Sequence, residues 1–169
     1  IIRRLRQEKK NEQKIAQLLQ QNSWYHHISY ANINMKRLSI IIVTYNSEHD
    51  IYDCVSSIMK FSDIPLSEIE LIIVDNNSRD TDTMFIKLKE LYGNDIVLIK
   101  NTHNGGYGQG NNVGIKKATA PVILIMNPDV RLIEPIFKTA VEAFENNSEL
   151  AMYGMKQMLT PCLLYTSDA

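Results

Sequence analysis

The chain has 169 residues, of which 44% are hydrophobic and 22% charged, and its formal net charge at pH 7 is −1. This length and apolar content suit one compact domain, and the near-zero charge excludes the basic surface by which proteins attract nucleic acids. No apolar run approaches the roughly 20 residues of a membrane-spanning helix, so we expect no membrane span.

Residues 1–34 form a polar leader that differs in composition from the segment after it. The spacing of Ile15, Leu18 and Leu19 predicts a surface helix within it. Its basic residues are not followed by the apolar core of a signal peptide. Because Met35 is a natural start for the apolar run that follows, we expect the leader to be upstream sequence that is not native to the domain.

Apolar, β-branched runs alternate with segments of helical spacing from residue 38 to residue 155. The runs predict strands over residues 38–43, 71–74, 96–99 and 122–126, with a fifth strand beginning at 150–153. The segments between them predict helices over residues 50–61, 81–92, 111–118 and 134–146. Ser47 or Asp50 suits the start of the first helix, and Gly93 the end of the second. This alternation is typical of an α/β fold with a mostly parallel sheet, right-handed crossovers and helices on both faces.

The last residues, 159–169, break the pattern and stop without a closing element. We expect them to be a non-native or truncated tail, and the chain to be a fragment of a longer protein. The domain is therefore expected to extend over residues 35–158.

Polar residues follow each of the first four predicted strands. They are Thr44-Tyr45-Asn46, Asp75-Asn76-Asn77, Asn104-Gly105-Gly106 and Asn127-Pro128-Asp129. In a parallel sheet all the carboxyl ends lie on one edge, and ligands bind beyond that edge. A polar group at the border of an apolar layer costs free energy unless it is hydrogen-bonded or coordinated. The four polar strand ends together predict a ligand site.

Two familiar phosphate-binding loops are excluded. A dinucleotide fingerprint needs GxGxxG directly after the first strand, whereas here the glycines follow the third strand and Asn111 stands in the last glycine position. A Walker A loop needs GxxxxGK[ST], and the chain has no such run.

Four stretches, in this order, resemble the family 2 glycosyltransferases, whose fold is the Rossmann-like GT-A sandwich. They are SIIIVTYNSE (39–48), LIIVDNNSRDTD (71–82), NGGYGQGNNVGI (104–115) and ILIMNPDV (123–130). The resemblance covers residues 37–155, the donor-binding part of the domain, and the last two stretches are most similar to rhamnosyltransferase-type members. It implies metal-assisted transfer of a sugar from a dTDP- or UDP-sugar to an acceptor hydroxyl, with inversion.

The resemblance also implies a set of nucleotide-binding residues: Thr44, Tyr45, Asn46, Asp75, Asn77, Gly105, Gly106, Gly108, Asn111, Asn112 and Asn127. Asp75 would accept the N3–H of uracil or thymine, since an ionised carboxylate only accepts hydrogen bonds and cytosine has no donor at N3. The three glycines would let the backbone approach the nucleoside, because glycine has no Cβ. Asn111 and Asn112 would open the next helix beside the ligand.

Asp129 matches the last acid of the family's DxD motif, which implies a Mg²⁺ or Mn²⁺ ion on the diphosphate. Oxygen ligands suit such hard cations, and the ion would stabilise the diphosphate as a leaving group. The first position of the motif is Asn127 here, which lowers the negative charge and predicts weak metal binding without nucleotide.

The catalytic base stays unassigned. Inversion needs a general base beside the acceptor, and the family supplies it from the second half of the domain. The carboxylates after Asp129 match no such motif; they are Glu134, Glu142, Glu145, Glu149 and Asp168. We therefore expect the base to be missing from this chain.

The resemblance further implies a saccharide or lipid-linked saccharide acceptor in polysaccharide assembly. The expected location is the cytoplasm, at or near the inner face of the membrane. The two cysteines, Cys54 and Cys162, lie far apart without a CxxC spacing. They are accordingly predicted to be reduced thiols of a cytoplasmic protein.

Several site residues have a plainer alternative. Asn111 and Asn112 are equally suited to helix N-caps. An Asx turn or a helix cap is the alternative for Asp75, a turn for Asp129 and a flexible connection for the glycine-rich loop, although the four motifs together favour the ligand site.

Two alternatives remain for the whole chain. One is a nucleotidyltransferase of nucleotide-sugar synthesis, although the segment TYNSEHD after the first strand lacks the basic, glycine-rich loop that a triphosphate needs. The other is a non-catalytic nucleotide-binding remnant.

Overall fold

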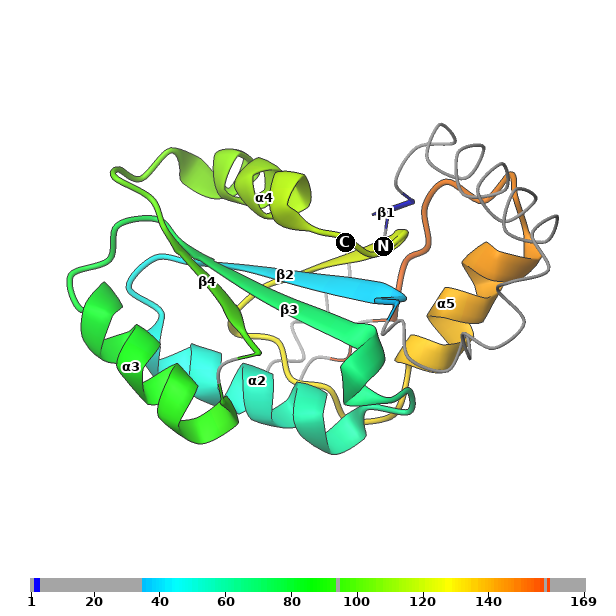
Figure 1. Cartoon of the computed structure of the whole chain (residues 1–169), viewed down its shortest axis with the longest axis horizontal. Helices are drawn as coiled ribbons and strands as arrows, with labels where there is room; N and C mark the ends of the chain where they lie inside the picture. Colours follow the sequence, from blue (N-terminus) through cyan, green and yellow to red (C-terminus); the bar gives the residue numbers. More distant parts are fainter. Residues whose placement is uncertain (1, 4–34, 94, 157, 159–169) are drawn as a thin grey trace, which may run out of the picture.

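Four parallel strands and a short antiparallel edge strand form the sheet at the centre of the structure (Figure 1). This computed structural model describes residues 2–3, 35–93, 95–156 and 158. The strands are β1 (Ile2–Arg3), β2 (Leu38–Thr44), β3 (Ile69–Asp75), β4 (Val97–Lys100) and β5 (Val122–Met126). Their order is β1-β5-β2-β3-β4, and only β1 is antiparallel to its neighbour. The predicted leader helix, the tail and Cys162 lie outside the described residues.

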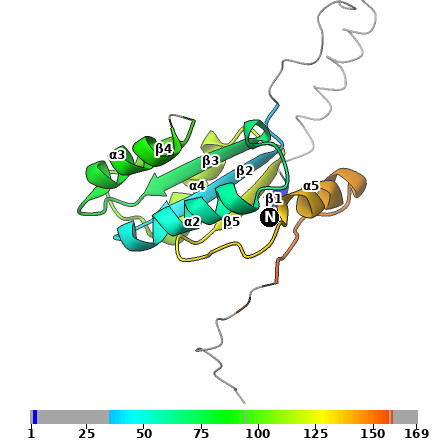
Figure 2. The ribbon, with the colours of Figure 1, turned by 90° about the horizontal axis from the view of Figure 1, so that it is seen from below.

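Helices cover both faces of the sheet, as the sequence predicts. They are α2 (Glu48–Phe61), α3 (Thr81–Tyr92), α4 (Gly106–Lys117) and α5 (Phe137–Asn146), with a 3-10 turn η3 (Leu66–Glu68) before β3. In Figure 1, α2 and α3 lie below the sheet and α4 above it, and α5 lies at the amino end of the strands. Figure 2 shows the same layers from below. Among the described helices, none combines the length and apolar character of a membrane-spanning segment.

The alternating side chains of each strand divide the core into two layers. Ile40 and Ile42 of β2 pack with residues of α2 and α3, whereas Ile41 and Val43 pack on the α4 side. Successive strand residues point to opposite faces, so a strand covered on both faces must be apolar throughout. This explains why β2 and β3 read as continuous apolar runs. The predicted α/β sandwich is confirmed.

Helix α4 lies very close to β2 because two of its glycines face the strand. A Cβ on Gly110 would lie 2.6 Å from Val43 Cγ1, and a Cβ on Gly114 would lie 2.5 Å from Ile41 Cγ2. The two glycines are four residues apart and so lie on one face of the helix. The short distance between this helix and the sheet therefore depends on them.

The prediction that this helix begins at Asn111 is wrong by five residues. Helix α4 begins at Gly106, so most of the glycine-rich stretch is helical. The Asn104 side-chain oxygen accepts the Gly106 N–H at 2.9 Å, and Gly106 has a φ of +82° that favours glycine. Local glycine content predicted a loop, and packing against the sheet overrides it. Asn111 and Asn112 are consequently not helix caps.

Helix α5 also begins later than predicted, at Phe137 and not at Glu134. Pro135 explains the delay, because proline disfavours helical geometry in the residue before it. The cap comes from far away in the sequence: Asp63 Oδ1 accepts the N–H groups of Phe137 at 3.1 Å and of Lys138 at 3.0 Å. A carboxylate at a helix start also interacts favourably with the helix dipole.

Three further predictions concern the fifth strand and the ends of two helices. The predicted fifth strand at 150–153 is wrong, since only Met152 makes a single bridge there. Ser47 occupies the position before α2, yet its hydroxyl bonds to the Tyr45 carbonyl oxygen and does not cap the helix. Gly93 ends α3 with a φ of +82°, as predicted.

We expect Gly114→Ala to lower the free energy of unfolding by about 1–3 kcal/mol, because its methyl group would overpack against Ile41. The matched control is Gly108→Ala in the same helix, where a Cβ meets no atom within 4 Å. That change should stabilise the helix by up to about 1 kcal/mol. Urea denaturation of both variants makes the comparison, and equal stabilities would contradict the close packing.

Candidate functional site

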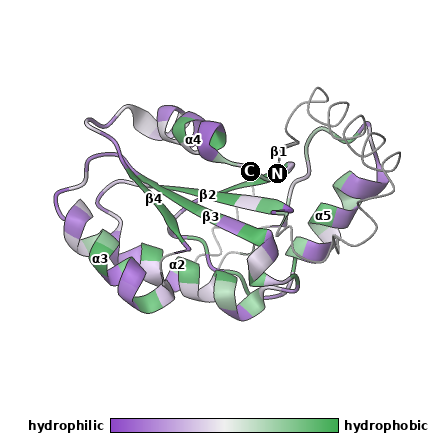
Figure 3. Ribbon diagram, in the orientation of Figure 1, coloured by the Kyte–Doolittle hydropathy of each residue, from purple (hydrophilic) through white to green (hydrophobic). Residues whose placement is uncertain are grey.

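The carboxyl ends of the four parallel strands meet at one edge of the sheet, and the polar strand ends gather there. Thr44 of β2 pairs with Asp75 of β3, which pairs with Lys100 of β4. Met126, the last residue of β5, lies two positions short of that row, opposite Ile42. Figure 3 shows hydrophobic strands that run into hydrophilic loops at this edge. The register thus brings the predicted site segments together.

Asp75 lies inside this edge and not on its surface. Its side chain is fully buried, and its carboxylate accepts four hydrogen bonds. The donors are the hydroxyls of Thr44 (2.9 Å), Ser78 (2.5 Å) and Thr81 (2.5 Å) and the backbone N–H of Ser78 (2.8 Å). A carboxylate has about four lone-pair positions, so these donors fill them. The Asp75 carboxylate therefore has a structural role, and its backbone bond reaches Ser78, three residues on, and not the residue two positions on that an Asx turn uses. Direct contact with a base stays a prediction.

Ser78 connects the loop after β3 to the loop after β2. Its hydroxyl accepts the Asn46 N–H at 2.8 Å while donating to Asp75, and the Arg79 N–H donates to Asn46 Oδ1 at 3.2 Å. Asn46 and Asn77 both have positive φ, +51° and +63°. Asparagine tolerates this conformation because its short side chain bonds locally. Both exposed loops are thus held in one arrangement.

Asn76, which the sequence analysis did not select, links β3 to the α4 side of the site. It follows Asp75, so its side chain points to the α4 face. There it donates to the Gly106 carbonyl oxygen at 3.0 Å and accepts from Asn101 Nδ2 at 2.8 Å. The start of α4 and the end of β4 are thereby tied to β3. The sequence could have indicated this role, because successive residues of a strand point to opposite faces of the sheet and Asn76 follows Asp75.

The two asparagines predicted to open a helix beside the ligand differ in exposure. Asn111 is buried, and its Nδ2 donates to the Tyr107 carbonyl oxygen at 3.0 Å. Its Oδ1 is the one buried side-chain oxygen or nitrogen without a hydrogen-bond partner among the described residues. Asn112 is exposed. Of the two, only Asn112 therefore lies at the surface.

The other predicted nucleotide-binding residues lie mainly on the surface of this edge. Tyr45, Asn46, Asn77 and Asn127 are exposed, as are the three selected glycines, Gly105, Gly106 and Gly108, whereas Thr44 is buried. Tyr107, in the first turn of α4, was not selected and is 49% exposed. Aromatic rings such as those of Tyr45 and Tyr107 present flat faces against which a planar ring can stack.

Asn127, Pro128 and Asp129 form a tight turn after β5. The Val130 N–H donates to the Asn127 carbonyl oxygen at 3.2 Å, which closes the turn over Pro128 and Asp129. Pro128 suits the second turn position because its φ is preset. Asp129 is exposed, and within the described part of the chain no hydrogen bond or ion pair reaches its carboxylate.

These residues fit a divalent cation that arrives with its ligand better than a preformed metal centre. The described residues contain no group of three or more His, Cys, Asp or Glu side chains that could hold a metal. Magnesium, however, is commonly held by one or two carboxylates together with substrate phosphates and water. A single free, exposed carboxylate at Asp129 matches that arrangement.

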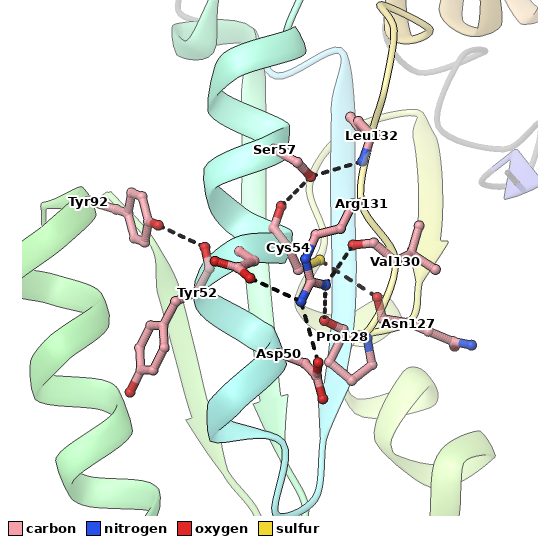
Figure 4. Close-up of polar contacts among 11 residues, drawn as sticks. Asp50, Tyr52, Cys54, Ser57, Tyr92, Asn127, Pro128, Val130, Arg131 and Leu132 are labelled. Carbon is pink, nitrogen blue, oxygen red and sulfur yellow. Dashed lines mark hydrogen bonds and ion pairs between the residues drawn. The ribbon is translucent and has the colours of Figure 1, made fainter. Parts of the chain in front are cut away.

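The turn is anchored to one face of α2, as Figure 4 shows. Cys54 Sγ donates to the Asn127 carbonyl oxygen at 3.6 Å, and the Leu132 N–H donates to Ser57 Oγ at 3.0 Å. Arg131 lies between these anchors and reaches Asp50 on the same helix. Burial raises the pKa of the Cys54 thiol to about 12; the Arg131 guanidinium opposes that rise, and the Asp129 carboxylate adds to it.

The comparison with known families gives a match to glycosyl transferase family 2 over residues 39–157. Among curated proteins, the chain is 31% identical over 126 residues to poly(ribitol-phosphate) beta-N-acetylglucosaminyltransferase TarS of Staphylococcus aureus. It is 30% identical over 122 residues to poly(ribitol-phosphate) beta-glucosyltransferase of Bacillus spizizenii. These alignments cover 72% and 71% of this chain but only 21% and 19% of the relatives. The chain therefore spans about a fifth of their length.

Solved structures of glycosyltransferases are also similar to this chain. The crystal structure of S. aureus TarS superimposes with a TM-score of 0.57 and 27% identity, covering 65% of this chain and 20% of that one. TarS residues 1–349 have been solved with UDP and with UDP-GlcNAc. Mannosyltransferase PcManGT from Pyrobaculum calidifontis, solved with GDP-Man and Mn²⁺, has a TM-score of 0.55 at 24% identity, covering 66% of this chain and 32% of that one; it supports the fold alone.

We expect Asp75→Asn to lower the free energy of unfolding by at least about 2 kcal/mol. The amide keeps the shape of the side chain but turns one acceptor into a donor, which leaves buried donors without partners. The control Thr44→Val removes a single hydroxyl and should cost about 1 kcal/mol. Denaturant titration without any nucleotide measures both, and unchanged stability of the Asp75 variant would rule out its structural role.

We also expect Cys54 to make stability fall at high pH. The unfolded thiol ionises above its ordinary pKa of 9.0, whereas the folded thiol keeps its proton up to about pH 12. Between these values the folded chain binds more protons, so stability falls with rising pH by up to about 1.4 kcal/mol per unit. Comparing wild type with Cys54→Ala at pH 7.5 and 10.5 isolates this effect. A stability difference that does not change with pH would contradict it.

Proposed function

The chain belongs to glycosyl transferase family 2, and from this premise we propose that it binds a nucleoside-diphosphate sugar at the carboxyl edge of its sheet. The sugar is then transferred to an acceptor hydroxyl with inversion. The observation that carries this proposal is the exposed Asp129 carboxylate, which has no hydrogen bond or ion pair with any described residue and lies beside three other polar strand ends. A diphosphate with its cation needs such a free acid, and a purely structural turn does not.

In this proposal the exposed residues contact the nucleotide and the buried ones hold them in place. Tyr45 offers its exposed ring to the base, and the open backbone at Gly106 and Gly108 admits the nucleoside. Asp75 keeps its predicted role toward N3–H only if one of its hydroxyl donors turns away, because its acceptor positions are filled. Hydroxyl groups can rotate to allow this.

Asp129, with Asn127 beside it, would hold Mg²⁺ or Mn²⁺ on the diphosphate. A cation bound there supplies positive charge that neutralises the diphosphate as it departs. Within the chain, Asp129 provides the oxygen ligand, and the turn around it sets the direction in which that ligand points. We assign no catalytic base. Glu145 is unsuited to that role, since it is bound to Arg37 at the opposite end of the sheet.

The relatives named above indicate which nucleotide the donor sugar carries. TarS was solved with UDP-GlcNAc, which supports a UDP-sugar over a dTDP-sugar for this chain. The rhamnosyltransferase subtype stays a prediction, because the two relatives are named for N-acetylglucosaminyl and glucosyl transfer. The poly(ribitol-phosphate) in their names supports a polymer as the acceptor. The family match favours this function over the nucleotidyltransferase alternative.

The test is a calorimetric titration of the chain with UDP, dTDP and CDP, with and without Mn²⁺. We expect UDP or dTDP to bind, CDP to bind more weakly, and Asp129→Asn to weaken binding in Mn²⁺ tenfold or more, about 1.4 kcal/mol. The control Asp95→Asn changes an exposed acid just before the amino end of β4, away from the site edge.

If the Asp129 and Asp95 variants bind the nucleotide with equal affinity in Mn²⁺, Asp129 is not a metal ligand. A folded wild-type chain that binds none of the three nucleotides would overturn the proposed site and favour polar strand ends that serve only as turns.

A further inference from the structure

We propose that Arg131 is a positioning residue for Asp129: its guanidinium group fixes the turn that carries the predicted metal ligand. This inference rests on the proposed function, because it concerns the same site. Arg131 lies two residues after Asp129 and is shown with the turn and α2 in Figure 4. None of the motifs read from the sequence includes it.

The contacts of Arg131 divide between its two terminal nitrogens. One nitrogen, Nη1, donates to the carbonyl oxygens of Pro128 at 3.1 Å and Val130 at 3.2 Å. The other, Nη2, lies 3.4 Å from Asp50 Oδ1 and 3.6 Å from Asp53 Oδ2 on α2. A planar guanidinium can make all these contacts at once, and so it links the turn to the helix.

These contacts fix the backbone on both sides of Asp129. The Pro128 carbonyl belongs to the peptide unit before Asp129, and Arg131 holds it. The N–H of Val130 belongs to the peptide unit after Asp129, and it donates to the Asn127 carbonyl oxygen. The exposed Asp129 side chain has no bonds of its own to set its direction within the described residues. Its position therefore depends on these two peptide units.

The energetics favour a positioning role over a stabilising one. The two ion pairs are long, and the side chains of Asp50 and Asp53 are 50% and 75% exposed. Exposed pairs of this kind contribute little to stability. A metal ligand, in contrast, must be held to within roughly 0.5 Å of its productive geometry. Removing the guanidinium should therefore affect ligand binding much more than folding.

Arg37 provides a matched control. It also pairs with two carboxylates, those of Glu68 and Glu145, and its side chain is 33% exposed, against 31% for Arg131. It lies at the amino end of β2, however, at the opposite edge of the sheet from the turn. Arg37→Gln thus removes a comparable arginine without touching Asp129.

The experiment compares Arg131→Gln, Arg131→Lys and Arg37→Gln in the 169-residue chain. The first readout is amide hydrogen exchange of Val130 without ligand, measured by NMR. The second is calorimetric titration of Mn²⁺ in the presence of UDP, and thermal unfolding gives the stability of each variant. We expect Arg131→Gln to speed the exchange of Val130 and to weaken Mn²⁺ binding, each about tenfold, and Arg37→Gln to change neither. Lysine should not restore either value, since an ammonium group cannot bridge two carbonyls and two carboxylates.

Unchanged Val130 exchange in Arg131→Gln, full rescue by lysine, or an equal loss of Mn²⁺ binding in Arg37→Gln would each overturn the inference. Normal Mn²⁺ binding in Arg131→Gln would overturn it as well, while leaving the proposed function intact. Failure of the wild-type chain to bind Mn²⁺ with UDP would instead overturn the proposed function, and the positioning role with it.

Discussion

A carboxylate buried at the border of an apolar layer must be fully hydrogen-bonded, and this requirement at Asp75 organises the site edge. Its four donors come from β2, from the loop after β3 and from the start of α3. The backbone carbonyl of Asp75 also accepts the N–H of Asn101 after β4. An ionised group without these partners would cost several kcal/mol in such a position. The Asp75 side chain therefore holds the ends of β2 and β3 and the start of α3 together, and its backbone carbonyl holds the end of β4.

The polar end of β5 is held in place by different interactions. The turn after β5 is held by a charged arginine and by α2, outside the Asp75 network. Hydrogen bonds to the buried Asp75 carboxylate and to its backbone carbonyl hold the first three strand ends, whereas the turn that carries Asp129 is linked to α2 by exposed ion pairs of Arg131. This division suits the proposed chemistry, because the base and ribose need a preformed surface and the cation arrives with the diphosphate.

The glycines of the third motif serve two distinct purposes. Gly110 and Gly114 face β2 and allow α4 to approach it, while Gly106 and Gly108 are exposed, with no atom within 4 Å of where a Cβ would lie. The first pair explains why the helix can lie over the sheet, and the second leaves an open backbone at the site edge. A single glycine-rich stretch thus combines packing and access.

The sequence by itself determined the order and type of the elements and the four polar strand ends, because apolar periodicity and turn residues act locally. It also determined the family, since the four motifs occur in order. Tertiary structure decided where α4 and α5 begin, because packing on β2 and the distant cap from Asp63 override local preference. It also decided which of the two acids is hydrogen-bonded within the described part of the chain: Asp75 is, and Asp129 is not. Their partners lie elsewhere in the chain, with Thr44 31 positions from Asp75 and Asp50 81 positions from Arg131. No local pattern displays contacts of that separation, because they exist only after the sheet has formed.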